Sequence, residues 1–238
     1  MAIDSGAGNS RGGVRNADVL ERHLQAVREA LAAVPPGETT VTIGGDCGVD
    51  LAPIETALSV FGDRLTLVWF DAHADLNTPQ SSPSGAFHGM VLRALLGDGP
   101  EGLRPAQSVS ADRVVLAGAR SLDAGEREFV ERRGIRHIGV EQLTRPGPLL
   151  AQVRATGAKA VYVHIDLDVL DPQIFPAVGT PEPGGLGVED LLEALRALMD
   201  EFTLAGIALT EYERADDSGP EEAVLRQIVS GLFGTASH

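Results

Sequence analysis

Two apolar runs of the chain, each with the composition of a buried strand, end in closely spaced acidic residues. The two clusters are Asp71-Ala72-His73-Ala74-Asp75 after residues 65–70 and Asp166-Leu167-Asp168 after residues 160–165. Carboxylates that lie together repel one another, and burial strengthens this repulsion. A pair of divalent cations is the simplest source of compensating charge, and oxygen ligands with one imidazole favour Mn²⁺, Mg²⁺ or Fe²⁺ over a thiolate-rich zinc site. Two carboxylates that bridge such ions hold them about 3.5–4 Å apart, a spacing that suits the activation of water.

Strand and helical periodicities alternate along the chain, which is typical of an α/β sandwich with three layers and a mostly parallel sheet. We predict strands at residues 40–43, 65–70, 113–118, 135–139, 159–165 and 203–210. We predict helices at residues 17–33, 50–60, 124–133, 146–156, 188–200 and 220–232, and a further helix of about ten residues from Phe87. The polar clusters follow the carboxyl ends of predicted strands, which is the edge where parallel sheets bind ligands. The sequence therefore predicts one site at this edge.

The bulk properties restrict the class of protein. With 238 residues the chain fits a single domain, residues 1–238, of which residues 1–16 are expected to be flexible. A formal net charge of −15 argues against a nucleic-acid partner or an anionic membrane surface. The only cysteine, Cys47, excludes an internal disulfide and agrees with a reducing compartment. We therefore expect a cytoplasmic protein without a signal peptide or membrane span.

Five polar or glycine-rich motifs follow one another between about residue 40 and the C-terminus. They are Gly44-Gly45-Asp46-Cys47, Asp71-Ala72-His73-Ala74-Asp75-Leu76-Asn77, Ser84-Gly85-Ala86-Phe87-His88-Gly89-Met90, Asp166-Leu167-Asp168-Val169-Leu170-Asp171-Pro172 and Gly179-Thr180-Pro181-Glu182-Pro183-Gly184-Gly185-Leu186. In this order they resemble the motifs of the arginase, or ureohydrolase, family. The resemblance implies an arginase-like fold, a dinuclear Mn²⁺ centre and hydrolysis of a guanidino C–N bond. The usual first strands of the family have no match here, so the strand at 40–43 is expected to lie nearer an edge of the sheet.

The resemblance implies a set of metal ligands with one departure from the family pattern. The implied ligands are Asp71 and Asp166 as bridges, His73 and Asp168 for one ion, and Asp75 and Cys47 for the other. The family normally has histidine at position 47. Cysteine is shorter and would bind as a thiolate, a soft ligand that Mn²⁺ does not favour. The second ion is then weakly held, replaced by a softer ion such as Zn²⁺ or Fe²⁺, or absent. A small buried residue at a tight turn is the alternative role of Cys47.

The resemblance also assigns catalytic groups. His88 would be the proton shuttle for the leaving amine, and Asp75 would hydrogen-bond the bridging solvent. Glu211 would pair with the guanidinium group, whose planar fork of donors suits a carboxylate. Thr180 would flank that end of the substrate.

The far end of the substrate distinguishes arginine from agmatine, because only arginine carries an α-carboxylate and an α-ammonium group. In arginases an Asn and hydroxyl groups of a loop bind the carboxylate, and an Asp receives the ammonium. The matching residues here are Asn77, Ser82, Ser84 and Asp123. Asp123 also fits the position of a helix N-cap, and one family asparagine is replaced by Ala86. We therefore expect an arginine-like α-amino acid, with Nω-hydroxyarginine as a close variant, and release of urea or a hydroxyurea.

Other functions stay open at this point. Agmatine or a guanidino acid is an alternative substrate. A catalytically degenerate scaffold subunit with this fold is an alternative class, favoured by Cys47 and the unmatched first strands. A metal-dependent amide hydrolase fits the paired acid motifs less well. His164, in the strand before Asp166, is expected to be packed and hydrogen-bonded behind the ligands, with direct ligation of a metal ion as the less favoured alternative. Trimers and hexamers are usual in the family, so we expect a homo-oligomer.

Overall fold

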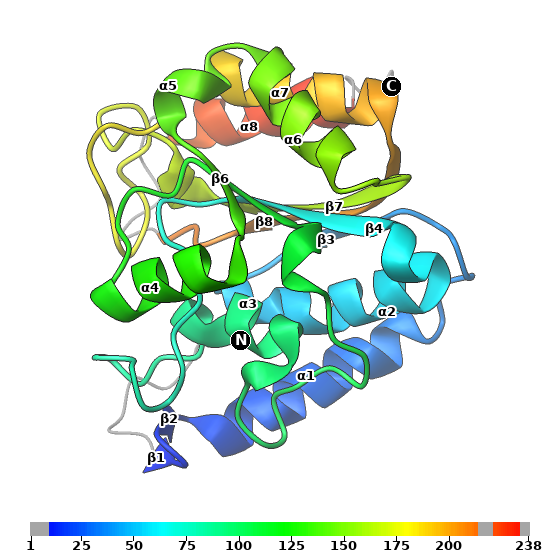
Figure 1. Cartoon of the computed structure of the whole chain (residues 1–238), viewed down its shortest axis with the longest axis vertical. Helices are drawn as coiled ribbons and strands as arrows, with labels where there is room; N and C mark the ends of the chain where they lie inside the picture. The colour runs from blue at the N-terminus through cyan, green and yellow to red at the C-terminus, as the bar shows by residue number, and fades with distance from the viewer. Residues whose placement is uncertain (1–9, 214–220, 234–238) are drawn as a thin grey trace.

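The computed structural model of the chain describes residues 10–213 and 221–233 (Figure 1). Within these residues, six parallel strands form one sheet in the order β3-β8-β7-β4-β5-β6. The strands are β3 Thr40–Ile43, β4 Leu65–Phe70, β5 Val114–Ala117, β6 Arg136–Ile138, β7 Ala160–Asp166 and β8 Thr203–Thr210. All six predicted strands are confirmed.

Helices cover both faces of the sheet, which gives the three layers expected from the sequence (Figure 1). One layer holds α1 Ala17–Leu31, α2 Leu51–Phe61, α3 Val91–Arg93 and α4 Ala124–Arg133. The other layer holds α5 Val140–Leu143, α6 Pro146–Ala155, α7 Val188–Glu201 and α8 Glu221–Phe233. None of the helices in the described residues is both long enough and apolar enough to cross a membrane.

The apolar run of β4 shows how the sequence produces these layers. Successive strand residues point to opposite faces, so a strand that is covered on both sides is buried at every position and is mostly apolar. Leu65, Leu67 and Trp69 pack with the core beneath α1 and α2, whereas Val68 and Phe70 pack with the core beneath α6 and α7. All five side chains are buried. The strand that precedes the first acid cluster is therefore held rigidly from both sides.

β3 forms one edge of the sheet, as expected from the unmatched first strands. Two of its apolar side chains are exposed to solvent, Val41 at 50% and Ile43 at 73%. A short hairpin, β1 Ser10–Arg11 and β2 Val14–Arg15, precedes α1 and contacts the loop at 77–86, where the Arg15 N–H donates to the Gly85 carbonyl at 2.8 Å. The segment 1–16 was expected to be flexible, and its first nine residues lie outside the described residues.

The predicted helix after Phe87 is a short, interrupted helical segment. It consists of a 3₁₀ turn at His88–Met90, the single turn α3, and a π-type turn at Ala94–Asp98. Inside this last turn, Gly97 has φ of +92°, a left-handed conformation that glycine adopts at low cost. The hairpin β1–β2 and the helix α5 were not predicted, because elements of two to four residues are too short to establish a period.

Candidate metal centre

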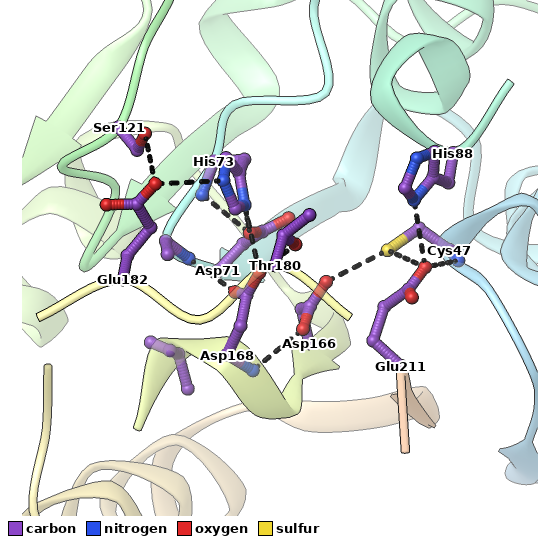
Figure 2. Close-up of polar contacts among 12 residues, drawn as sticks. Cys47, Asp71, His73, His88, Ser121, Asp166, Asp168, Thr180, Glu182 and Glu211 are labelled. Atoms are coloured by element: carbon purple, nitrogen blue, oxygen red, sulfur yellow. Dashed lines mark hydrogen bonds and ion pairs between the residues drawn. The ribbon is translucent and has the colours of Figure 1, made fainter. Parts of the chain in front are cut away.

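The two acid clusters meet because their strands are neighbours. β4 and β7 pair in parallel with Phe70 opposite Ile165, so Asp71 and Asp166 leave the sheet at the same edge. Both carboxylates are almost completely buried. Figure 2 shows them between His73 on one side and Cys47 on the other. The cluster that the sequence predicted is therefore present at the carboxyl edge of the sheet.

One half of the cluster is built around His73. Its Nδ1 lies 2.9 Å from Asp168 Oδ2 and 3.5 Å from Asp71 Oδ1 (Figure 2). Thr180 donates a hydrogen bond from its hydroxyl to Asp168 Oδ2 at 3.2 Å. The possible ligand atoms of Asp71, His73 and Asp168 lie within 4.8 Å of one another, so these three side chains can hold one cation. Thr180 therefore contacts the cluster itself.

The other half of the cluster is built around Cys47, which begins the 3₁₀ turn Cys47–Asp50 after β3. Its Sγ is buried and lies 3.2 Å from Asp166 Oδ2 and 3.6 Å from Glu211 Oε1. The cysteine thus reaches the carboxylates, although it is shorter than histidine. Burial, together with the charge of Asp75, raises the pKa of the Cys47 thiol well above its ordinary value, so a cation would be needed to hold it as a thiolate.

The pKa values of the acids reflect their crowding. Burial and the charge of Asp168 raise the pKa of Asp71 to about 6, and burial and the charge of Asp71 raise those of Asp75 and Asp166 well above the usual range. Burial alone would lower the pKa of His73, but its hydrogen bonds to Asp168 and Asp71 raise it to about 11. Burial would raise the pKa of Asp168, but the hydrogen bond from His73 outweighs this and lowers it. The site thus attracts positive charge strongly.

The donor atoms fit divalent cations. Asp75 Oδ2 and His164 Nε2 are buried and have no hydrogen-bond partner among the described residues. Asp75 and Glu211 adopt left-handed backbone conformations, with φ of +53° and +63°. Such conformations cost about 1–3 kcal/mol for residues other than glycine and persist where the surrounding structure imposes them. Carboxylate oxygens and imidazole nitrogens are ordinary ligands of these ions.

Glu211 and His88 lie at the rim of the cluster, beside Cys47 (Figure 2). His88 Nδ1 is 3.2 Å from Glu211 Oε1, and the same oxygen accepts a hydrogen bond from the Cys47 N–H at 3.1 Å. The hydrogen bond to Glu211 outweighs partial burial and raises the pKa of His88. The residues that the sequence analysis named as guanidinium receptor and proton shuttle are therefore brought together.

The predicted residues for the α-amino end form two separate pairs. The Asn77 side-chain amide donates to Asp123 Oδ2 at 2.9 Å. Asp123 is the N-cap residue of α4, as predicted. Ser82 and Ser84 lie farther along the same loop with their hydroxyl oxygens 3.4 Å apart, and each accepts a hydrogen bond from a loop N–H. The structure thus brings Asn77 and Asp123 together, and it places the two serines beside each other.

Some residues that shape the site were missed in the sequence. Glu182 Oε1 lies 3.9 Å from His73 Nε2 and accepts a hydrogen bond from Ser121 (Figure 2). Glu126 accepts hydrogen bonds from the N–H groups of Leu76 and Asp123, which ties the loop to α4. Glu182 lies inside a motif that was quoted from the sequence, whereas Glu126 lies in the predicted helix three residues after the expected N-cap Asp123, and these positions were the available signals.

Asp50 was also missed, and its sequence neighbourhood offered little sign of its role. It is fully buried at the end of the turn that begins with Cys47, and it lies 2.6 Å from His164 Nδ1. The expected hydrogen bond of His164 is therefore present. The sequence did allow one prediction: His164 lies on the same face of β7 as Asp166, because residues two apart in a strand share a face.

The chain was compared with known proteins. The family model described as "Arginase family" matches residues 4–231. An arginase of Staphylococcus aureus (strain COL) is 31% identical over 234 residues, which cover 93% of this chain and 76% of that protein. An arginase of Bacillus caldovelox is 32% identical and covers 90% of this chain and 77% of its own length. A crystal structure of Entamoeba histolytica arginase in complex with L-ornithine has a TM-score of 0.88 at 26% identity, and it covers 98% of this chain and 83% of that chain.

The match of the family model spans nearly the whole chain, and the relatives exceed 30% identity with most of their length covered. The parallel sheet, the helical layers on its two faces and the grouped acid clusters agree with the fold and the site that the resemblance in the sequence implied. The chain therefore belongs to the arginase family and is a hydrolase of that family.

Proposed function

We propose that the protein hydrolyses the guanidino C–N bond of arginine or a close α-amino acid analogue such as Nω-hydroxyarginine, with release of urea or a hydroxyurea. The reaction depends on two divalent cations held by the acid cluster. Mn²⁺ is the expected metal at the position formed by carboxylates and the imidazole of His73. Asp71 and Asp166 are the proposed bridges between the two ions.

The observation that carries this proposal is the pairing of Glu211 with His88 beside the cluster. The carboxylate of Glu211 is the receptor for the guanidinium cation, because a planar fork of N–H groups pairs well with two carboxylate oxygens. His88 Nδ1 lies only 3.2 Å from that carboxylate, which can accept a proton donated by this ring nitrogen. A cation receptor and a proton donor thus lie next to the ligands that would activate water.

The roles of the side chains follow from their positions. When bound, the cations supply a positive charge that lowers the pKa of water and makes it a nucleophile. Asp75, a buried carboxylate of the cluster, would accept a hydrogen bond from that water. His88, whose pKa is raised by its hydrogen bond to Glu211, would transfer a proton to the leaving amine.

The preference for an α-amino acid rests on Asn77 and Asp123. Asn77, two residues beyond Asp75 in the loop, donates from its side-chain amide at 2.9 Å to Asp123, the N-cap residue of α4. An amide beside a carboxylate offers a donor for an α-carboxylate and an acceptor for an α-ammonium. Agmatine has neither group and would not use this pair. Ser82 and Ser84 are the proposed additional hydroxyl donors.

Urea release from arginine, Nω-hydroxyarginine and agmatine tests the proposal, with the purified protein loaded in turn with Mn²⁺, Fe²⁺, Co²⁺ and Zn²⁺. We expect the two α-amino acids to be hydrolysed with higher kcat/KM than agmatine. Glu211→Gln keeps the size of the side chain and removes its charge, so it should lower kcat/KM by about 10–100-fold, since hydrogen bonds to charged groups contribute about 1.5–3 kcal/mol.

Glu141→Gln is the matched control, because Glu141 is exposed on α5, in the layer away from α1 and α2. It should leave kcat/KM unchanged. No release of urea or hydroxyurea from any of the three substrates with any of the four metals would refute the proposed function. Agmatine hydrolysed faster than both amino acids would refute the assigned substrate.

Three further expectations belong to this proposal. We propose a single domain over residues 1–238, a homo-oligomer that is a trimer or hexamer, and a cytoplasmic location. Light scattering of the purified protein measures the oligomeric state, and a monomer would contradict the second expectation.

A further inference from the structure

His164 lies in the middle of β7, on the face of the sheet that carries Asp166. Residues two apart in a strand share a face, so Tyr162, His164 and Asp166 point to the same side. The His164 ring is fully buried and stacks on the Trp69 ring, with centroids 3.6 Å apart and planes inclined by 12°. This packing holds the imidazole in one orientation.

A buried carboxylate determines which nitrogen of His164 carries the proton. His164 Nδ1 lies 2.6 Å from Asp50 Oδ2, and Tyr162 donates a hydrogen bond to Asp50 Oδ1 at 2.8 Å. Since the carboxylate accepts the Nδ1 proton, the neutral ring presents a lone pair at Nε2. A carboxylate behind the imidazole is also the usual way in which proteins orient histidines that bind metal ions.

Nε2 of His164 is buried without a hydrogen-bond partner among the described residues, and so is Asp75 Oδ2. A polar atom that is buried without a hydrogen-bond partner destabilises the folded protein. The two residues belong to one group with Cys47 and Asp71, whose possible ligand atoms all lie within 4.8 Å of one another. Two residues that each have an unpartnered buried atom thus lie in one group that could hold a single cation.

The 4.8 Å limit on the distances within this group is close to the spacing of ligands around one ion. Metal–nitrogen and metal–oxygen bonds of about 2.0–2.2 Å, and metal–sulfur bonds of about 2.3 Å, place opposite ligands about 4–4.6 Å apart. We propose that His164 Nε2 binds one of the two cations together with Cys47, Asp71 and Asp75. This inference rests on the proposed metal-dependent function and adds a ligand from the middle of a strand.

The two cation positions then differ in chemistry. The position with His73 offers carboxylates and one imidazole, whereas the position with His164 adds the sulfur of Cys47. Thiolate and imidazole ligands favour Zn²⁺ and other late ions of the first row over Mn²⁺. We therefore expect the His164 position to prefer Co²⁺ or Zn²⁺, and the His73 position to accept Mn²⁺ more readily.

Co²⁺ titration followed by absorption spectroscopy tests the assignment, because a cobalt–thiolate bond gives a charge-transfer band that identifies the position with Cys47. His164→Asn retains an N–H donor but is too short to span both Asp50 and the cation. Tyr162→Phe is the matched control, because it removes the other side-chain hydrogen bond to Asp50 and leaves the imidazole in place.

We expect His164→Asn to weaken Co²⁺ binding at the thiolate-containing position by at least about tenfold, which is the smallest loss usual even for residues behind a ligand. The ion at the His73 position should stay bound with unchanged affinity. Tyr162→Phe should bind both ions and show the charge-transfer band.

The unaltered protein provides a second measurement, which does not depend on a variant that folds. On addition of Zn²⁺, the ¹⁵N resonance of His164 Nε2 should move to the range of a metal-bound nitrogen. An unmoved resonance with Zn²⁺ bound, or unchanged Co²⁺ binding in a folded His164→Asn protein, would overturn this proposal alone. If the unaltered protein binds neither Co²⁺ nor Zn²⁺, this inference and the proposed metal-dependent function fail together.

Discussion

His88 Nδ1 lies 3.2 Å from Glu211 Oε1, although the two residues come from segments more than 120 positions apart in the chain. Glu211 follows β8, and its left-handed backbone is tied to the turn after β3 by a hydrogen bond from its N–H to the Gly45 carbonyl at 2.7 Å. This contact links the proposed substrate receptor, Glu211, to the proposed proton shuttle, His88, so replacing Glu211 should alter the pKa of His88.

Glu211→Gln should lower the pKa of His88. The pKa of His88 is raised chiefly by its hydrogen bond to the Glu211 carboxylate, and an amide is neutral and supports the imidazolium less well. NMR titration of His88 in the two proteins measures the change. Glu141→Gln, on α5, should leave the titration unaltered. An equal His88 pKa in the parent and in Glu211→Gln would contradict the coupling.

Asp123→Asn should reduce discrimination between arginine and agmatine. Asparagine caps helices as well as aspartate does, so α4 should stay stable while the negative charge is lost. A hydrogen bond to a charged group contributes about 1.5–3 kcal/mol, which predicts a loss of about 10–100-fold in kcat/KM for arginine. The value for agmatine, which has no α-ammonium, should stay unchanged and serves as the internal control. An equal loss for both substrates would show that Asp123 acts through the helix alone.

The metal-free protein should become less stable as the pH rises. Asp71 has a folded-state pKa of about 6 against a usual value of 3.8, so the folded state binds more protons between these values. Its contribution to the free energy of unfolding is present below pH 3.8 and is lost as the pH rises through about 6, at up to about 1.4 kcal/mol per pH unit. The raised pKa values of Asp75 and Asp166 act in the same direction.

Urea unfolding in the presence of a chelator at several pH values measures this slope. Asp71→Asn should flatten it, because the variant no longer has the titrating carboxyl group. Asp200→Asn, at an exposed position of α7, should retain it. Addition of Mn²⁺ at pH 8 should restore stability, since an ion that binds only the folded state stabilises it. A free energy of unfolding that rises between pH 4 and pH 7 without metal would contradict the crowding of the acids.

Asp166→Asn should remove most of the metal content. Asp166 lies between the two halves of the cluster, with Asp168 N–H donating to its Oδ1 at 2.8 Å and Cys47 Sγ lying 3.2 Å from its Oδ2. Loss of a bridging carboxylate affects both proposed positions, so we expect fewer than one ion per chain by elemental analysis after gel filtration. Asp200→Asn again serves as the control. Full metal content in Asp166→Asn would mean that Asp166 does not bridge.

The positions of the acids were predictable because their strands have strong patterns. β4 is buried at every position because it is covered on both faces, and all its residues except Thr66 are apolar, so Asp71 marks the point where the apolar run ends. Parallel strands bring such endings to one edge, so the meeting of Asp71 with Asp166 followed from the order of elements alone. The edge position of β3 followed from the unmatched first strands.

The contacts behind the cluster were less predictable, because they depend on how the elements pack. Asp50 meets His164 only because the turn after β3 lies against the face of β7, and no local pattern specifies that contact. A register shift between Val161 and Tyr162 also sets which residues of β8 face His164. Glu182 reaches His73 through the path of an irregular loop, which carries no period at all.

X-ray diffraction from crystals of the purified protein grown with Mn²⁺ or Co²⁺ tests most directly whether bound cations hold the buried carboxylates together. The anomalous map should contain peaks between the side chains of Asp71 and Asp166, for two ions about 3.5–4 Å apart. A map without peaks at this place, with the two carboxylates turned away from each other into solvent, would contradict the assignment.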